Sequence, residues 1–246
     1  MKIFGFKEKK KKLSGSAFRN IVANSIIGFV LLSMFALTYV GGTLKAFSQA
    51  DETPIYNGNL NSNKICLMIN VYWGNEYLDS MLETLNSNNV KTTFFLGGMW
   101  VEKYPELAKK IYENGHEIAN HGYFHKDQDK INLDGNKKEI SSCHNIVKTT
   151  LGVEMNLFAP PSGAFNSSTM QAAKALNYNV IMWTRDTIDW RDQDADTIYT
   201  RATKNAKGGD LILMHPTKCT AEALPGIIKT LQENGFTLTT VTECLS

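Results

Sequence analysis

The residues in this sequence best suited to bind a metal are His121 and His125, with three residues between them. On one turn of a helix, side chains four positions apart lie on the same face, so these two imidazoles could share one cation. The spacing alone is more typical of a surface or capping pair. Other segments of the chain must therefore decide between the two interpretations.

Further polar residues follow apolar segments that are typical of buried strands. Asn70 lies at the end of an apolar run at 65–71, His215 directly follows the run 210–214, and Asp186 and Asp189 follow the run 179–183. In barrels of alternating strands and helices, the chemistry sits at the C-terminal ends of the strands. These side chains are therefore expected to share one site.

Strands alternate with helices along residues 64–246, which implies a parallel sheet covered on both sides. About seven such units favour an α/β fold of the deformed (β/α) barrel type, closed or nearly closed. The expected strands are 65–71, 91–96, 117–119, 157–158, 179–183, 210–214 and 237–241, and the expected helices are 77–88, 105–114, 136–151, 167–176, 195–206 and 221–234.

Positive charge is concentrated at the N-terminus of the chain. Residues 1–50 hold many lysines and only one acidic residue, Glu8, so the remainder of the chain is net acidic. Binding to phosphates needs a basic face on the domain itself. A nucleic-acid partner is therefore not expected.

The first 63 residues are predicted to place the domain at a membrane. Residues 1–20 are typical of a basic cytoplasmic tail, and 21–44 of a transmembrane anchor, because the apolar run has about the 20 residues that a spanning helix needs. The alternative is a secretory signal that is cleaved near Ala50. In both cases a domain at 64–246, after a linker at 45–63, is expected outside the cytoplasm.

The four cysteines show no C-x-x-C spacing, so neither a zinc knuckle nor a redox pair is indicated. An extracytoplasmic location permits disulfides, and Cys219 with Cys244 is one pairing to consider. Buried free thiols are the favoured interpretation.

In this order, the segments resemble the polysaccharide deacetylases with a NodB-homology domain, which form carbohydrate esterase family 4. The resemblance covers about residues 64–246 and is closest to the PdaB-like branch associated with sporulation. It implies that His121 and His125 bind a divalent metal, commonly zinc. It also implies that His215 is the general acid and that Asp186 and Asp189 orient catalytic groups.

The same resemblance points to a site for an N-acetylated sugar. A rigid turn rich in proline would direct the backbone N–H of Ser162 at an oxyanion, and exposed tryptophans are candidate surfaces for stacking on sugar rings. The predicted substrate-binding residues are Pro160, Pro161, Ser162, Gly163, Trp73, Trp190 and Leu213.

The first motif departs from the family pattern, which ordinarily supplies two adjacent aspartates, one as base and one as metal ligand. The positions aligned with this pair read Asn70 and Val71, and Ala159 replaces the arginine before the prolines. An amide has no useful basicity near neutral pH, and valine cannot bind a metal. The expected function is a metal-dependent hydrolase of N-acetyl groups on cell-wall or spore peptidoglycan, with its activity in doubt. The alternative is a catalytically silent protein that binds glycan or a partner at this cleft.

Overall fold

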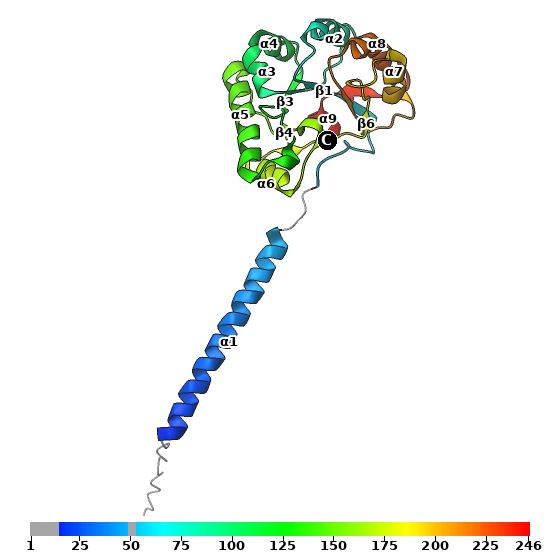
Figure 1. Ribbon diagram of the computed structural model, residues 1–246. Coiled ribbons are helices and arrows are strands. Elements are labelled where there is room, and N and C mark those ends of the chain that lie inside the picture. Colours follow the sequence, from blue (N-terminus) through cyan, green and yellow to red (C-terminus); the bar gives the residue numbers. More distant parts are fainter. Residues whose placement is uncertain (1–14, 49–52) are drawn as a thin grey trace, which may run out of the picture. The chain divides into compact units, whose positions relative to one another are not determined.

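A computed structural model of the chain describes residues 15–48 and 53–246, and the chain divides into two compact units, Met1–Glu52 and Thr53–Ser246. The first unit contains helix α1, Gly15–Ser48 (Figure 1). Among the residues that the structure describes, no helix has the length and apolar character needed to cross a membrane, so the predicted anchor at 21–44 is not confirmed. The basic residues 1–14 and the cleavage site predicted near Ala50 lie outside the described residues.

The second unit is built around a parallel sheet with the strand order β5-β4-β3-β2-β1-β7-β6, in which β8 also pairs with β1 (Figure 1). Residues 179–186 begin beside β4 and end beside β7, so a single extended segment joins the two edges. The sheet is therefore curled, and the predicted α/β fold with parallel strands is confirmed. The strands are β1 (Lys64–Val71), β2 (Thr93–Leu96), β3 (Glu117–Asn120), β4 (Leu157–Phe158), β5 (Asn179–Val180), β6 (Arg185–Asp186), β7 (Leu211–Met214) and β8 (Thr237–Thr239).

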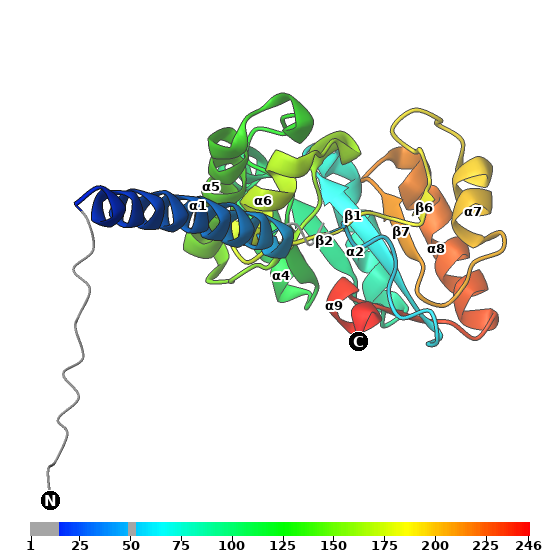
Figure 2. The same ribbon diagram turned by 90° about the horizontal axis from the view of Figure 1, so that it is seen from below.

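Helices surround the strands, as the second view shows (Figure 2). They are α2 (Asn75–Ser87), α3 (Gly98–Lys103), α4 (Pro105–Glu113), α5 (Leu133–Leu151), α6 (Ser167–Ala175), α7 (Ala195–Thr203), α8 (Lys218–Glu233) and α9 (Val241–Leu245), with short 3₁₀ turns η1 (Gln128–Lys130) and η2 (Pro161–Gly163).

Strand β1 divides the core into two clusters, because successive side chains of a strand point to opposite faces. Ile65 and Leu67 belong to the large cluster shared with the helices. Cys66 and Met68 belong to a smaller cluster, which Val241 of α9 also joins. Asn70 continues the second face at the C-terminal end of the strand, which places a polar group where the inner cluster ends.

Several element boundaries differ from the predictions. The last strand ends at Thr239, because the Thr240 side chain accepts a hydrogen bond from the Glu243 N–H and so begins α9. Helix α3 and strand β6 were not predicted, and both are shorter than a pattern of apolar residues can reveal.

Part of the predicted linker at 45–63 packs against the domain. The Ile55 N–H donates to the Val180 carbonyl at 2.8 Å, and the Met182 N–H donates to the Ile55 carbonyl at 2.7 Å. Ile55 therefore forms a parallel bridge with Ile181 beside β5. Alternation of apolar residues cannot predict a bridge of one residue.

All four cysteines are free, so the disulfide considered between Cys219 and Cys244 is not formed. Cys66, Cys143 and Cys244 are buried, in agreement with the favoured interpretation.

Candidate functional site

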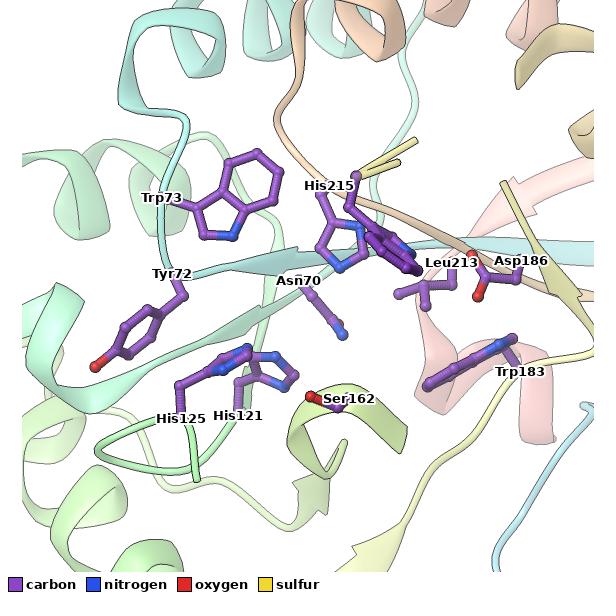
Figure 3. A pocket seen from close by; sticks show the side chains of 11 residues that line it. Asn70, Tyr72, Trp73, His121, His125, Ser162, Trp183, Asp186, Leu213 and His215 are labelled. Carbon is purple, nitrogen blue, oxygen red and sulfur yellow. The ribbon is translucent and has the colours of Figure 1, made fainter. Parts of the chain in front are cut away.

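A cavity of about 430 Å³ opens at the C-terminal ends of the strands, as predicted from the positions of the polar residues. Its size is typical of pockets for small molecules, about 300–1,000 Å³. The side chains come from segments far apart in the sequence and meet around one space (Figure 3). The lining residues are Asn70, Tyr72, Trp73, His121, His125, Ser162, Trp183, Asp186, Trp190, Leu213 and His215.

The two histidines meet in a loop that follows a strand, so they do not share the face of a helical turn that their spacing alone would allow. The loop follows β3, and two of its residues, Gly122 (φ 74°) and His125 (φ 55°), adopt left-handed backbone conformations. A right-handed helix cannot contain residues with positive φ, so the segment is not helical. The loop nevertheless places the two rings 5.1 Å apart between centroids, at an interplanar angle of 72°.

Two buried side chains hold this histidine loop. The Asn120 side-chain oxygen accepts a hydrogen bond from the Gly122 N–H at 2.8 Å. The carboxylate of Glu139, on α5 and 3% exposed, accepts from the N–H groups of Tyr123 at 3.0 Å and Phe124 at 2.8 Å. Sequence reasoning missed Glu139, because no spacing distinguishes it from an ordinary residue of an amphipathic helix.

His121 presents an unprotonated ring nitrogen to the cavity. Its Nδ1–H donates to the Ala159 carbonyl at 2.8 Å, which leaves Nε2 as the acceptor. Burial lowers the pKa of His121 to about 3, and His125 nearby adds to the shift. Burial also lowers the pKa of His125. Both imidazoles are therefore neutral near pH 7, the form that binds a metal or accepts a hydrogen bond.

Asn70 forms part of the cavity floor and is 4% exposed. Its carbonyl oxygen Oδ1 has no hydrogen-bond partner within the described part of the chain. A buried acceptor left unpaired costs about 1–3 kcal/mol. Asn70 is thus a costly residue for the fold, because its oxygen is shielded from solvent and has no partner within the described residues.

Of the two residues aligned with the family's aspartate pair, only Asn70 lines the cavity. Val71 lies in the core cluster on the opposite face of the strand. Tyr72, which shares the face of Asn70, and Trp73 line the cavity instead. Sequence reasoning missed Tyr72, although the alternation of a strand extended from Asn70 would have indicated it.

The Tyr72 ring lies beside the histidine loop, with its centroid 4.9 Å from that of His125. It also covers Gly97, where an added Cβ would come within 2.2 Å of the Tyr72 ring. Tyr72 thus provides an aromatic wall at this position.

The divalent metal implied by the family does not fit the donors found here. Within the described residues, no group of three or more His, Cys, Asp or Glu side chains is placed to hold a metal ion. Catalytic zinc sites use three protein ligands and one open position. His121 and His125 provide two imidazoles, and Asn70 adds only a neutral amide.

His215 is held in a complete hydrogen-bond network on the other side of the cavity. Its Nδ1 is 2.8 Å from Asp189 Oδ1, and its backbone N–H donates to Asp189 Oδ2 at 2.6 Å. Thr220 Oγ1 on α8 donates to the same Oδ2 at 2.6 Å. Asp189 is 1% exposed and does not line the cavity, so it positions His215. The Nε2 of His215 is left to face a bound molecule.

The turn after β4 brings Ser162 to the cavity, and of its four predicted residues only Ser162 lines it. Ser162 (φ 57°) and Gly163 (φ 65°) are both left-handed, and the turn begins with Pro160 and Pro161. Gly163 allows close packing, since a Cβ there would lie 2.9 Å from the Trp183 ring. Pro160, Pro161 and Gly163 therefore shape the turn rather than contact a ligand.

Aromatic side chains form the walls and the rim. Trp73 stacks on His215 with ring centroids 5.8 Å apart and an interplanar angle of 9°. Trp73 and Trp190 are 43% and 55% exposed, so both can offer a face to a ligand that enters from solvent. Trp183 also lines the cavity, as do the predicted residues Leu213 and Asp186.

The carboxylate of Asp186 is already engaged in a hydrogen bond with the backbone. Its Oδ1 accepts a hydrogen bond from the Ile188 N–H at 2.8 Å, which fixes the start of the loop to Asp189. It is the only carboxylate among the residues that line this cavity. Within the described residues it does not join the two histidines of the loop in a group that could hold a metal ion.

Comparisons with known proteins agree with this architecture. The family model for polysaccharide deacetylase matches residues 57–181. The Bacillus subtilis protein YlxY is 42% identical over 192 residues, which cover 78% of this chain but only 60% of YlxY. A peptidoglycan-N-acetylglucosamine deacetylase of Bacillus cereus is 31% identical over 191 residues, 76% of this chain and 70% of that protein.

The crystal structure of a CE4 family pseudoenzyme from Bacillus anthracis is similar with a TM-score of 0.78 and 36% identity. The similarity covers 81% of this chain and 71% of that one. A mutant of that pseudoenzyme has restored enzymatic activity. With its curled parallel sheet, its paired histidines and these relatives, this chain belongs to the polysaccharide deacetylase family.

Proposed function

We propose that this chain is an N-deacetylase of peptidoglycan-type glycans whose turnover is impaired. A single observation supports both parts of the proposal. His215, held by Asp189, faces the same cavity as His121, His125 and Asn70, and only the His215 side is complete. The cavity is therefore suited to hold an N-acetylated sugar but poorly suited to activate water.

The chemistry divides between the two sides. Hydrolysis of an amide requires attack of water on the carbonyl and protonation of the departing amine. His215 can donate that proton from Nε2, because Asp189 holds its Nδ1. On the opposite side, neutral Asn70 cannot remove a proton from water.

The cavity has few ligands to offer a divalent metal. Imidazole nitrogens are suitable ligands for zinc, and His121 and His125 would be the residues that hold it. Without an anionic ligand, we expect its affinity to be low.

Acetate release from tetra-N-acetylchitotetraose and from peptidoglycan tests the proposal. We expect slow release by the full-length chain, and its loss in His215→Ala. His144→Ala, which removes a histidine on α5 that does not line the cavity, is the control. Release that is unaffected by His215→Ala would contradict the proposed acid.

The second candidate is a silent protein that binds glycan without hydrolysing it. The missing carboxylate beside the histidines favours it, as does the likeness to the Bacillus anthracis pseudoenzyme. Binding of the tetramer with no acetate release, even at high protein concentration, would support this candidate over the first.

We further propose that the domain acts outside the cytoplasm, where peptidoglycan lies. The basic N-terminus and the names of the relatives support this location. Protease treatment of intact cells would degrade an external domain and spare an internal one. The mass of the mature chain would distinguish retention of residues 21–44 from cleavage near Ala50. The assignment to the PdaB-like branch and to sporulation stays a prediction.

A further inference from the structure

The segment between β6 and α7 contains a residue with a strained backbone. Ile188 has a φ of 54°, in the left-handed region that β-branched residues avoid. A residue in such a conformation costs stability, and it persists only where the surrounding structure holds it. The next residue is Asp189, whose carboxylate binds His215. The strain therefore lies directly beside the group that orients the proposed proton donor.

Hydrogen bonds close this segment on itself. We call residues 186–192 the Asp189 loop. The Ile188 N–H donates to Asp186 Oδ1 at 2.8 Å. The Ile188 carbonyl accepts from the N–H groups of Arg191 at 3.1 Å and Asp192 at 2.9 Å. These three bonds lie within the loop, so they define its shape without attaching it to a neighbouring element.

Arg201, on helix α7 beside β6, joins the two ends of the Asp189 loop (Figure 2). Its Nη1–H donates to the Thr187 carbonyl at 2.8 Å, and its Nη2–H donates to Asp192 Oδ2 at 2.6 Å. Thr187 is itself attached to β7, because its hydroxyl donates to the Leu213 carbonyl at 2.8 Å. One planar guanidinium thus ties the far end of the loop to the end that the sheet fixes.

A second guanidinium binds the same carboxylate but does not span the loop. Arg191 donates from Nε to Asp192 Oδ1 at 2.8 Å and from Nη2 to Asp192 Oδ2 at 2.9 Å. It is adjacent to Asp192 in sequence, so this pair leaves the distance between the two ends of the loop unconstrained. The Arg191 side chain is also 57% exposed, against 30% for Arg201. The two arginines therefore separate pairing with Asp192 from bridging of the loop.

We propose that Arg201 is a positioning residue that holds the strained Asp189 loop in the conformation in which Asp189 meets His215. The inference rests on the proposed function and deepens it, because it adds a residue of α7 to the support of the proposed proton donor. Arg201 does not line the cavity, so it acts on His215 through the loop. The same bridge sets the position of Trp190, which lies in the loop and lines the cavity.

The proton on His215 Nδ1 tests this inference without any need for turnover. In the NMR spectrum of the full-length chain, a histidine N–H bound to a buried carboxylate gives a downfield signal, which His215→Ala would identify by its loss. We expect its exchange rate with water to rise at least about tenfold in Arg201→Met, because the loop then opens more often. Arg191→Met removes a guanidinium from the same carboxylate and is the control, in which the rate should not change.

Relief of the backbone strain provides a test that a general loss of stability would not pass. Asparagine adopts the left-handed conformation more readily than isoleucine. We therefore expect Ile188→Asn, introduced into the Arg201→Met chain, to restore slow exchange of the His215 proton. Arg201→Lys, which keeps the charge but has one ammonium for two partners, serves as a second variant if Arg201→Met fails to fold.

Two results would overturn the inference while leaving the proposed function intact. One is a folded Arg201→Met or Arg201→Lys chain in which the His215 proton exchanges at the rate of the unaltered chain. The other is an equal rise in exchange in Arg191→Met. Failure of the proposed function would be a separate result, namely no acetate release by a chain whose His215 proton responds to Arg201→Met as expected.

Discussion

The two sides of the cavity differ in how completely their polar groups are paired. On one side, His215, Asp189 and Thr220 form a closed network around a buried carboxylate. On the other side, two neutral histidines adjoin Asn70, whose carbonyl is unpaired. The comparison shows one side in which a buried carboxylate fixes its histidine, and another in which no carboxylate accompanies the two histidines within the described residues. Under the proposed function, the cleft would keep its shape and the proton donor His215 but lack the group that activates water.

The largest expected effect comes from breaking the complete side. Asp189→Asn should lower the free energy of unfolding by about 3 kcal/mol, because His215 and Thr220 lose a buried charged partner. Urea unfolding measures the change. Asp196→Asn, at an exposed position of α7, is the control and should change little. An equal effect of both variants would mean that the network contributes nothing specific.

Repair of the incomplete side should have the next largest effect. Asn70→Asp adds an anionic oxygen beside two imidazoles, and we expect zinc affinity to rise by about 100-fold, or about 2.7 kcal/mol. Competition with a zinc indicator measures this. Asn145→Asp adds the same charge on the surface and should leave zinc affinity unchanged.

Acid should destabilise the incomplete side. Burial lowers the pKa of His121 from an ordinary value of 6.5 to about 3, so between these values the unfolded chain binds a proton that the folded chain does not. Stability is then lost as the pH falls below about 6.5. Without metal, we expect His121 alone to account for a loss of about 2 kcal/mol at pH 5 relative to pH 7.

His121→Asn should reduce this loss, as urea unfolding at the two pH values would show. His116, whose pKa burial lowers to about 4, contributes equally in both chains and cancels from the difference. The same pH dependence in both chains would show that His121 is not a buried neutral group.

The smallest expected effect concerns the turn that carries Ser162. Gly163→Ala combines a left-handed backbone with a contact of 2.9 Å to Trp183, and should cost about 1 kcal/mol more than Gly152→Ala. Gly152 has the same backbone region, with no atom near an added Cβ. Thermal unfolding followed by tryptophan fluorescence measures the difference. An equal loss of stability in the two variants would mean that the Trp183 ring moves aside without an energetic penalty.

Much of the fold follows from local patterns in the sequence. The apolar run at 65–71 and the amphipathic helices predict β1, α2, α5 and α8 within a few residues, because burial on one or two faces leaves a clear periodicity. Short elements such as β6 and α3 leave no such pattern. The bridge that Ile55 forms with Ile181 joins residues more than 120 positions apart, and no local pattern in the sequence predicts such a pairing.

The sequence predicts which residues line the candidate site better than it predicts how they are arranged. His121, His125 and His215 were found because their residue types are rare and follow strands. The left-handed loop could not be predicted from the spacing of its histidines, and the support from Glu139 has no signal in the sequence. The inward position of Tyr72, and the outward position of Val71, depend on the exact register of β1.

Acetate release by Asn70→Asp, compared with the unaltered chain in the presence of zinc, tests the difference between the two sides most directly. We predict release at least about 100-fold faster for Asn70→Asp, the lower range of what a general base contributes, and loss of that gain in Asn70→Asp with His215→Ala. The contradictory result is a folded Asn70→Asp chain that binds zinc and shows no gain. A gain in Tyr72→Asp alone would place the missing carboxylate at position 72 instead.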